Sequence, residues 1–146
     1  MKKNLLVFYF FLIILFQACG YEPIYSSKNY LFKIKNINYE NNRINNQIVN
    51  SLRSISNQNA KNFINLDIKS RKDKNVISKD KSGDPLIFEL TVFVDIVIND
   101  KQKTFMGKQI YNNKKNKFEL NEYEIELEKQ ITDNIINEIF IYLGGL

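Results

Sequence analysis

The sequence contains no histidine, only one cysteine, and five glycines. Without histidine, the chain cannot build a histidine-assisted serine or cysteine nucleophile or a histidine metal site. A single cysteine cannot form an intramolecular disulfide or a thiolate-rich zinc site. The few glycines form neither a GxxxxGK[ST] nor a GxGxxG motif, so no phosphate-cradling loop is visible. These absences predict a protein that is not an enzyme, with no metal site and no dissociable cofactor.

The charge balance is mildly basic, with 21 lysine and arginine residues against 16 aspartate and glutamate residues and a net charge of +5. A chain of 146 residues suits a single domain. Two of the positive charges, Lys2 and Lys3, lie at the very start of the chain. Because the remaining excess is small, it favours a polyanionic partner only where the lysines cluster.

The start of the chain has the layout of an export signal. Lys2 and Lys3 precede an apolar run at residues 5–16, and Ala18 supplies a small residue just before Cys19. A positive start, an apolar run and a small residue at the cut are the parts of a secretory signal. The run is also shorter than the roughly 20 residues of a membrane-spanning helix. We therefore predict that residues 1–18 are a cleaved signal peptide, with a short uncleaved anchor as the alternative.

Cys19 stands at the end of this run. There the thiol has neither a core in which to pack nor a second thiol with which to oxidise. Acylation would explain the cysteine, because each acyl methylene buried in the membrane contributes about 0.8 kcal/mol. Two or three acyl chains therefore anchor a protein stably. The segment resembles a bacterial lipoprotein signal, which implies a cut before Cys19, a covalent N-acyl diacylglycerol on it and, with Gly20 next, sorting to the outer membrane. We predict that Cys19 is the lipidation site and that residues 19–29 form a lipidated leader.

Apolar periodicity predicts one domain at residues 30–146, with a strand, a helix, three strands and a second helix. The strand signal is strongest at residues 86–98, where every second residue is apolar. We predict an α+β two-layer sandwich, in which two helices pack on a mainly antiparallel four-stranded sheet in the order β-α-β-β-β-α. The predicted strands are residues 30–37, 63–70, 86–98 and 104–111, a short strand follows at 118–120, and the predicted helices are residues 41–59 and 121–143.

The second predicted helix begins with a good N-cap, Asn121, and carries several glutamates in its first turns. Glu122, Glu124, Glu126 and Glu128 alternate along the sequence, which spreads them around the helix. A catalytic carboxylate pair needs two groups brought together across a cleft. We therefore interpret these four glutamates as a solvated helix start.

The predicted core combines one apolar stripe from each helix with one face of the sheet. Four aromatic residues on the sheet are interpreted as packing residues, with a lipid-chain or partner contact as the alternative. These four are Phe88, Phe93, Phe105 and Tyr111. The stripes and the sheet face consist of Ile44, Ile48, Leu52, Ile55, Ile64, Leu66, Ile68, Leu86, Leu90, Val92, Val94, Ile96, Ile98, Leu127, Ile131, Ile135, Ile136, Ile139, Phe140 and Leu143.

Basic residues gather in two predicted turns, residues 69–85 and 112–117. Lysine and arginine in such turns are either simply solvated or contact phosphate groups. Nucleic acid is a poor fit, because the chain is predicted to be exported and aromatic residues are not interleaved with the basic ones. The phosphates would then belong to a lipid. The candidate phosphate-binding residues are Arg71, Lys72, Lys74, Lys79, Lys81, Lys114 and Lys115.

The phrase CGYEPIY at residues 19–25 resembles the start of the mature lipopolysaccharide-assembly lipoproteins of the LptE family, which often read Cys-Gly-aromatic-x-Pro-Leu-Tyr. Ile24 stands where leucine is usual. The resemblance implies two helices on a four-stranded sheet and a non-catalytic protein, lipid-anchored on the periplasmic side of the outer membrane. It implies insertion as a plug inside the barrel protein LptD, delivery of lipopolysaccharide to the outer leaflet, and lipopolysaccharide binding through basic residues. The alternative is another small envelope lipoprotein that binds the cell wall or a different envelope complex.

Overall fold

The computed structural model describes residues 32–145, so the predicted signal peptide, Cys19 and the leader lie outside the described part of the chain. The element order β-α-β-β-β-α confirms the sequence prediction. The elements are β1 (Phe32–Tyr39), α2 (Arg43–Ile55), β2 (Asn62–Lys79), β3 (Pro85–Ile98), β4 (Lys101–Asn112) and α3 (Lys117–Leu143).

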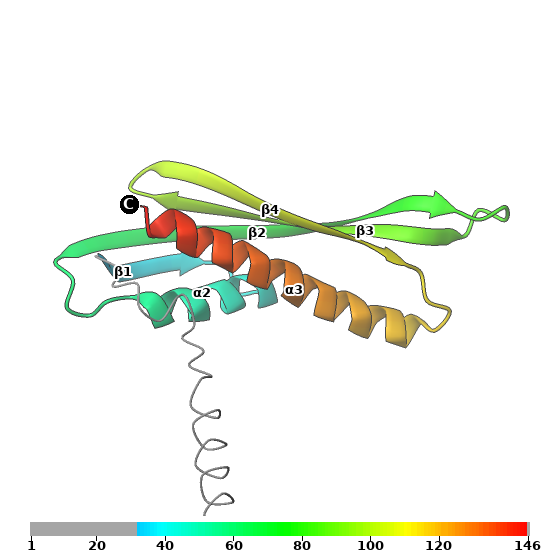
Figure 1. Cartoon of the computed structure of the whole chain (residues 1–146), viewed down its shortest axis with the longest axis horizontal. Helices are drawn as coiled ribbons and strands as arrows, with labels where there is room; N and C mark the ends of the chain where they lie inside the picture. Colours follow the sequence, from blue (N-terminus) through cyan, green and yellow to red (C-terminus); the bar gives the residue numbers. More distant parts are fainter. Residues whose placement is uncertain (1–31, 146) are drawn as a thin grey trace, which may run out of the picture.

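The four strands form one mixed sheet in the order β1-β2-β3-β4. β1 runs parallel to β2, while the β2–β3 and β3–β4 pairs are antiparallel. Figure 1 shows α2 and α3 on the same side of this sheet, with its other face left open. This is the predicted α+β two-layer sandwich with a mainly antiparallel sheet.

The core lies between the helices and the covered sheet face. Ile48 and Leu52 of α2 and Ile135 and Ile139 of α3 are completely buried, as the helical stripes predict. α3 approaches the sheet closely at Gly107 of β4, where an added Cβ would lie 2.6 Å from the side chain of Ile131. Glycine at this position therefore lets α3 lie directly against β4.

The β3–β4 connection is tighter than the predicted turn at residues 99–103. It consists of Asn99 and Asp100 alone, with φ of 48° and 66°. Two left-handed residues are typical of the hairpin turn whose twist matches that of the flanking strands. Asparagine and aspartate tolerate this conformation better than other non-glycine residues. The turn therefore fixes Ile98 opposite Lys101 and sets the register of the hairpin.

The predicted loop at residues 69–85 is wrong: β2 continues as a strand to Lys79, and only residues 80–84 turn. Period-two hydrophobicity fails along this stretch because its helix-facing positions hold Ser70, Lys72 and Lys74 in place of apolar residues. The β3 register pairs this part of β2 through to Lys79 opposite Pro85. The candidate basic residues of this segment are thus mostly held on a strand.

The start of the second helix also differs from the prediction. α3 begins at Lys117, and its N-cap is Asn116, whose side chain accepts a hydrogen bond from the Phe118 amide at 2.9 Å. The apolar pair Phe118 and Leu120 suggested a short strand, but both lie in the first helical turns. Asn121 is inside the helix and does not cap it. The helix ends at Leu143, as its following glycines predict.

The layers have unequal lengths. β1 pairs with β2 only as far as Ile68, and α2 covers the same end of the sheet, while β2, β3 and α3 continue beyond them (Figure 1). We call the end with the Asn99–Asp100 turn the proximal end and the end with residues 80–84 the distal end. The predicted core residue Leu86 is 47% exposed because it lies at the distal end, where cover is incomplete.

Candidate functional site

The structure separates the predicted basic residues into three settings. Lys72 and Lys74 face α3 and pair with its glutamates. Arg71 points to the open face of the sheet, where its Cζ lies 3.8 Å from the ring centroid of Phe93. The other four, namely Lys79, Lys81, Lys114 and Lys115, lie at the distal end.

The first setting is a buried carboxylate with two cations. Arg43 of α2 donates to Glu128 Oε1 at 2.6 Å, and Lys72 of β2 donates to Oε2 at 2.6 Å. The Glu128 side chain is only 5% exposed. Its burial alone would raise the pKa of this carboxyl, but the hydrogen bonds and charges of Arg43 and Lys72 outweigh burial and hold the pKa below its ordinary value. The carboxylate therefore ties α2, α3 and β2 together.

One turn earlier on α3, Glu124 makes a similar link. Its Oε1 accepts from Lys74 and, at 2.7 Å, from the Tyr111 hydroxyl of β4. Burial and the adjacent carboxylate both raise the pKa of Tyr111 above its ordinary value, so this hydroxyl stays protonated and donates. Lys74 Nζ also lies 4.1 Å from the ring centroid of Phe88.

These pairs correct the interpretation of the glutamates as a solvated helix start. Glu124 and Glu128 are four residues apart, which places them on one helix face, and that face meets β2. Glu122 and Glu126 are exposed, as predicted. The i, i+4 spacing of Glu124 and Glu128 indicates that both lie on one helix face. It did not identify their partners, because Lys72 and Lys74 were predicted to lie in a loop at residues 69–85. Lys72 and Lys74 thus have structural partners inside the domain.

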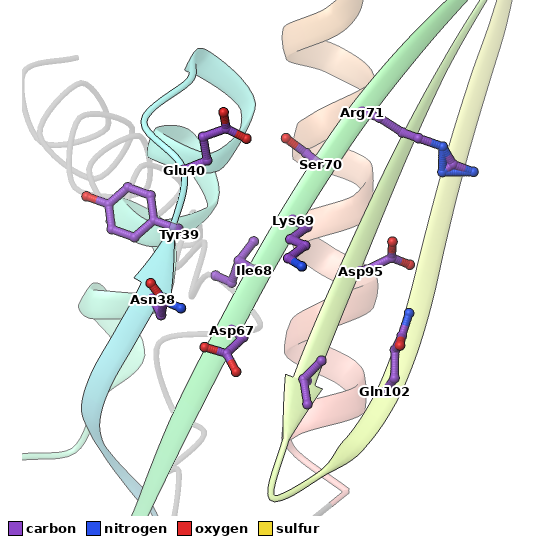
Figure 2. A pocket seen from close by; sticks show the side chains of 11 residues that line it. Asn38, Tyr39, Glu40, Asp67, Ile68, Lys69, Ser70, Arg71, Asp95 and Gln102 are labelled. Atoms are coloured by element: carbon purple, nitrogen blue, oxygen red, sulfur yellow. The ribbon is translucent and has the colours of Figure 1, made fainter.

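The second setting is a hollow of about 830 Å³ beside the end of β1, shown in Figure 2. Asp67, Asp95, Lys69 and Arg71 approach it from β2 and β3, and Glu40 stands at its rim. Acidic and basic groups are mixed there. The hollow as a whole therefore does not favour a free anion over a cation, although Lys69 and Arg71 remain exposed on the open face of the sheet.

The third setting is the distal end, where two segments meet that are far apart in the sequence. The Asn113 amide donates to the Leu86 carbonyl at 2.8 Å, and its side chain donates to the Pro85 carbonyl at 2.7 Å. These bonds hold the β4–α3 loop beside the β2–β3 turn. Figure 1 shows the β2–β3 turn and the β4–α3 loop at the same end of the molecule. Lys79 at the end of β2 and Lys81 in the turn therefore share this end with Lys114 and Lys115 of the loop.

Apolar side chains are exposed at the same end. Phe118 is 67% exposed, Ile77 52% and Val76 43%, and Leu86 joins them. Sequence reasoning found the lysines but missed this apolar surface, because the pattern predicted Leu86 as core and Phe118 as strand. The distal end therefore carries both cations and exposed apolar side chains, the two kinds of group that could bind an amphipathic anion.

Within residues 32–145, no three histidine, cysteine, aspartate or glutamate side chains are grouped so that they could hold a metal ion. None of the helices in the same range has the length and hydrophobicity needed to cross a bilayer.

No protein-family model matches the sequence, and no curated protein matches it significantly. Solved structures do share its fold. A minor lipoprotein of Acinetobacter baumannii is similar with a TM-score of 0.59 at 13% identity, over 80% of this chain and 94% of that one. An uncharacterised lipoprotein B of Nitrosomonas europaea gives a TM-score of 0.56 at 14% identity, over 76% of this chain and 83% of that one. At such identities the likeness establishes the fold that the chain shares with these two lipoproteins.

Proposed function

We propose that this protein is a lipid-anchored, non-catalytic lipoprotein of the bacterial outer membrane that binds lipopolysaccharide at its distal end. In this proposal it serves on the periplasmic side as the plug and assembly partner of an LptD-like barrel, and so takes part in lipopolysaccharide transport to the outer leaflet. The anchor is the N-acyl diacylglycerol on Cys19.

The observation that carries the proposal is the composition of the distal end. Lys79, Lys81, Lys114 and Lys115 offer cations to phosphates, while Val76, Ile77, Leu86 and Phe118 offer apolar surface to acyl chains. Lipopolysaccharide presents phosphates and acyl chains side by side. Nucleic acid presents phosphates but no acyl chains.

Two further features support an anchored envelope protein. The phrase CGYEPIY at residues 19–25 resembles the start of mature LptE-family proteins, and two solved structures with a similar fold are lipoproteins. The described domain begins at Phe32, which leaves a short leader between Cys19 and β1. A tether of this length would hold the domain close to the membrane surface.

The first prediction replaces the four distal lysines by glutamine (K79Q, K81Q, K114Q and K115Q together). Lys79, Lys81 and Lys115 are exposed, and Lys114 is half-buried with its Nζ 4.4 Å from the Tyr123 ring centroid. Because most of these charges act at an exposed surface, we expect about tenfold weaker binding of lipopolysaccharide micelles at low salt, and a smaller difference at high salt. Fluorescence anisotropy of labelled full-length protein in mild detergent measures both. The free energy of unfolding should change by less than about 0.5 kcal/mol.

The matched control removes the same charge at other exposed positions, namely Lys35, Lys61, Lys101 and Lys103. This control variant should bind lipopolysaccharide like the wild type. Equal weakening in both variants would show that net charge alone drives binding, and it would contradict a distal lipopolysaccharide site.

A further inference from the structure

The outer edge of β2 has an open stretch after β1 ends. Tyr39 opposite Ile68 is the last β1–β2 pair, but β2 continues to Lys79 with β3 on its inner side only. Within residues 32–145, no strand, turn or loop backbone pairs with the outer edge of this stretch. Figure 1 shows β2 running past the end of β1 toward the distal end.

The register indicates which backbone groups face outward. The two-residue turn makes Ile98 and Lys101 a hydrogen-bonded pair, so Ile98 directs its N–H and C=O toward β4. Its partner on β2, Leu66, therefore directs its own groups away from β3. Alternation along β2 gives the same outward direction to the backbone groups of Ser70, Lys72, Lys74 and Val76.

A groove runs beside this edge, between β2 and the first half of α3. It has a volume of about 380 Å³. Leu90, Ile125 and Asn121 line it together with the ion-paired side chains of Arg43, Lys72, Lys74, Glu124 and Glu128. Ile125 is 38% exposed there. An edge strand beside a helix-lined groove suits β-strand addition, in which backbone bonds give affinity and the groove receives alternate side chains.

The charges along the outer edge of β2 indicate which kind of partner strand it would bind. Five cations and one anion lie along it, but Lys72 and Lys74 already pair with Glu128 and Glu124 of α3. This leaves Lys69, Arg71 and Lys79 against Asp73. Two copies of this edge would place like charges opposite one another, which opposes self-pairing. An acidic strand would instead meet Lys69 and Arg71 on the open face of the sheet.

We propose that the outer edge of β2 between Lys69 and Lys79 binds an extended segment of a partner protein that alternates acidic with apolar residues. The apolar side chains enter the groove beside Leu90 and Ile125, and the acidic ones lie against Lys69 and Arg71. The inference does not depend on lipopolysaccharide or on a barrel, and its test uses neither.

The test measures amide hydrogen exchange in the full-length protein in mild detergent. The probe is a blocked heptapeptide of the sequence EVEVEVE, and the controls are its D-enantiomer and the lysine analogue KVKVKVK. We expect the L-peptide to slow exchange across residues 69–79 at least tenfold at saturation, and both controls to leave it unchanged. Equal effects of the two enantiomers, or no protection by either, would overturn strand addition.

Two variants separate backbone pairing from charge. Lys74→Ala and Lys74→Pro both lose the contact with Glu124, but only proline removes the outward N–H, and edge strands tolerate proline. Lys74→Pro should bind the peptide at least tenfold more weakly than Lys74→Ala at a similar melting temperature. Equal binding by the two folded variants would contradict the proposal. Protection of residues 69–79 by higher protein concentration alone would assign the edge to a second copy and also overturn it.

Discussion

Replacing Ile135 by alanine should destabilise the domain by about 2–5 kcal/mol, the range for truncating a large aliphatic side chain in a core. Ile135 is completely buried on α3, and its side chain reaches to 3.5 Å from the space above Gly107 on β4. The contact joins the helix layer to the sheet where α3 and β4 lie close together. Neighbouring side chains have little room to collapse into the cavity, because Ile131 already fills the space over Gly107. Urea unfolding followed by circular dichroism measures the loss.

Ile141 provides the control on the same helix, since it is 59% exposed. Ile141→Ala should change the free energy of unfolding by less than about 0.5 kcal/mol. If the two alanine variants unfolded at the same urea concentration, α3 would not pack on the sheet through the Ile135 face.

Replacing Arg43 and Lys72 together by methionine should cost about 3 kcal/mol at neutral pH, because Glu128 would keep its burial and lose both cations. We expect the lower part of the range for broken buried pairs, since the two cations are about half exposed and water screens them. Methionine keeps much of the length of both side chains, so the change isolates charge from packing. K61M/K101M removes two exposed positive charges and serves as the control.

The cost of the double variant should depend on pH. In the wild type the lowered pKa of Glu128 adds stability above the pKa of the unfolded chain, and that stability is lost as pH falls through the folded value. In the variant only burial acts on Glu128, so its folded pKa rises and ionisation costs stability as pH increases. The difference between the two proteins should therefore shrink from pH 7 toward about pH 4. A difference independent of pH would mean that Glu128 is not the group responsible.

The sequence was sufficient to predict the parts of the fold that depend on regular apolar periodicity. The stripe through Ile48 and Leu52, the alternation from Phe88 to Ile98 and the stripe through Ile135 are all buried as predicted. Each lies where a helix and the sheet cover one another. In such regions the buried positions must follow the period of the element, and the pattern is visible in one dimension.

The sequence predictions are wrong where the helices do not fully cover the sheet. The second half of β2 places Lys72 and Lys74 at its helix-facing positions, and their ion pairs with α3 replace apolar contacts that a periodicity search would detect. Lys79 and Lys114 could each be identified as candidates from sequence. The sequence does not show that the two lysines lie at the same end of the molecule, because that arrangement depends on the hydrogen bonds from Asn113 to Pro85 and Leu86. Those contacts are set by the register of a hairpin that the sequence pattern does not specify.

The most direct test of the proposed function is affinity purification of the full-length protein from detergent-solubilised envelopes, followed by mass spectrometry of the whole eluate. We predict one large outer-membrane barrel protein in amounts comparable to the bait, and a Cys19 peptide that carries the mass of an acylated diacylglycerol. Depletion of the protein should then impair assembly of that barrel. Recovery of a free monomer with an unmodified Cys19, together with normal barrel assembly on depletion, would contradict the proposed function.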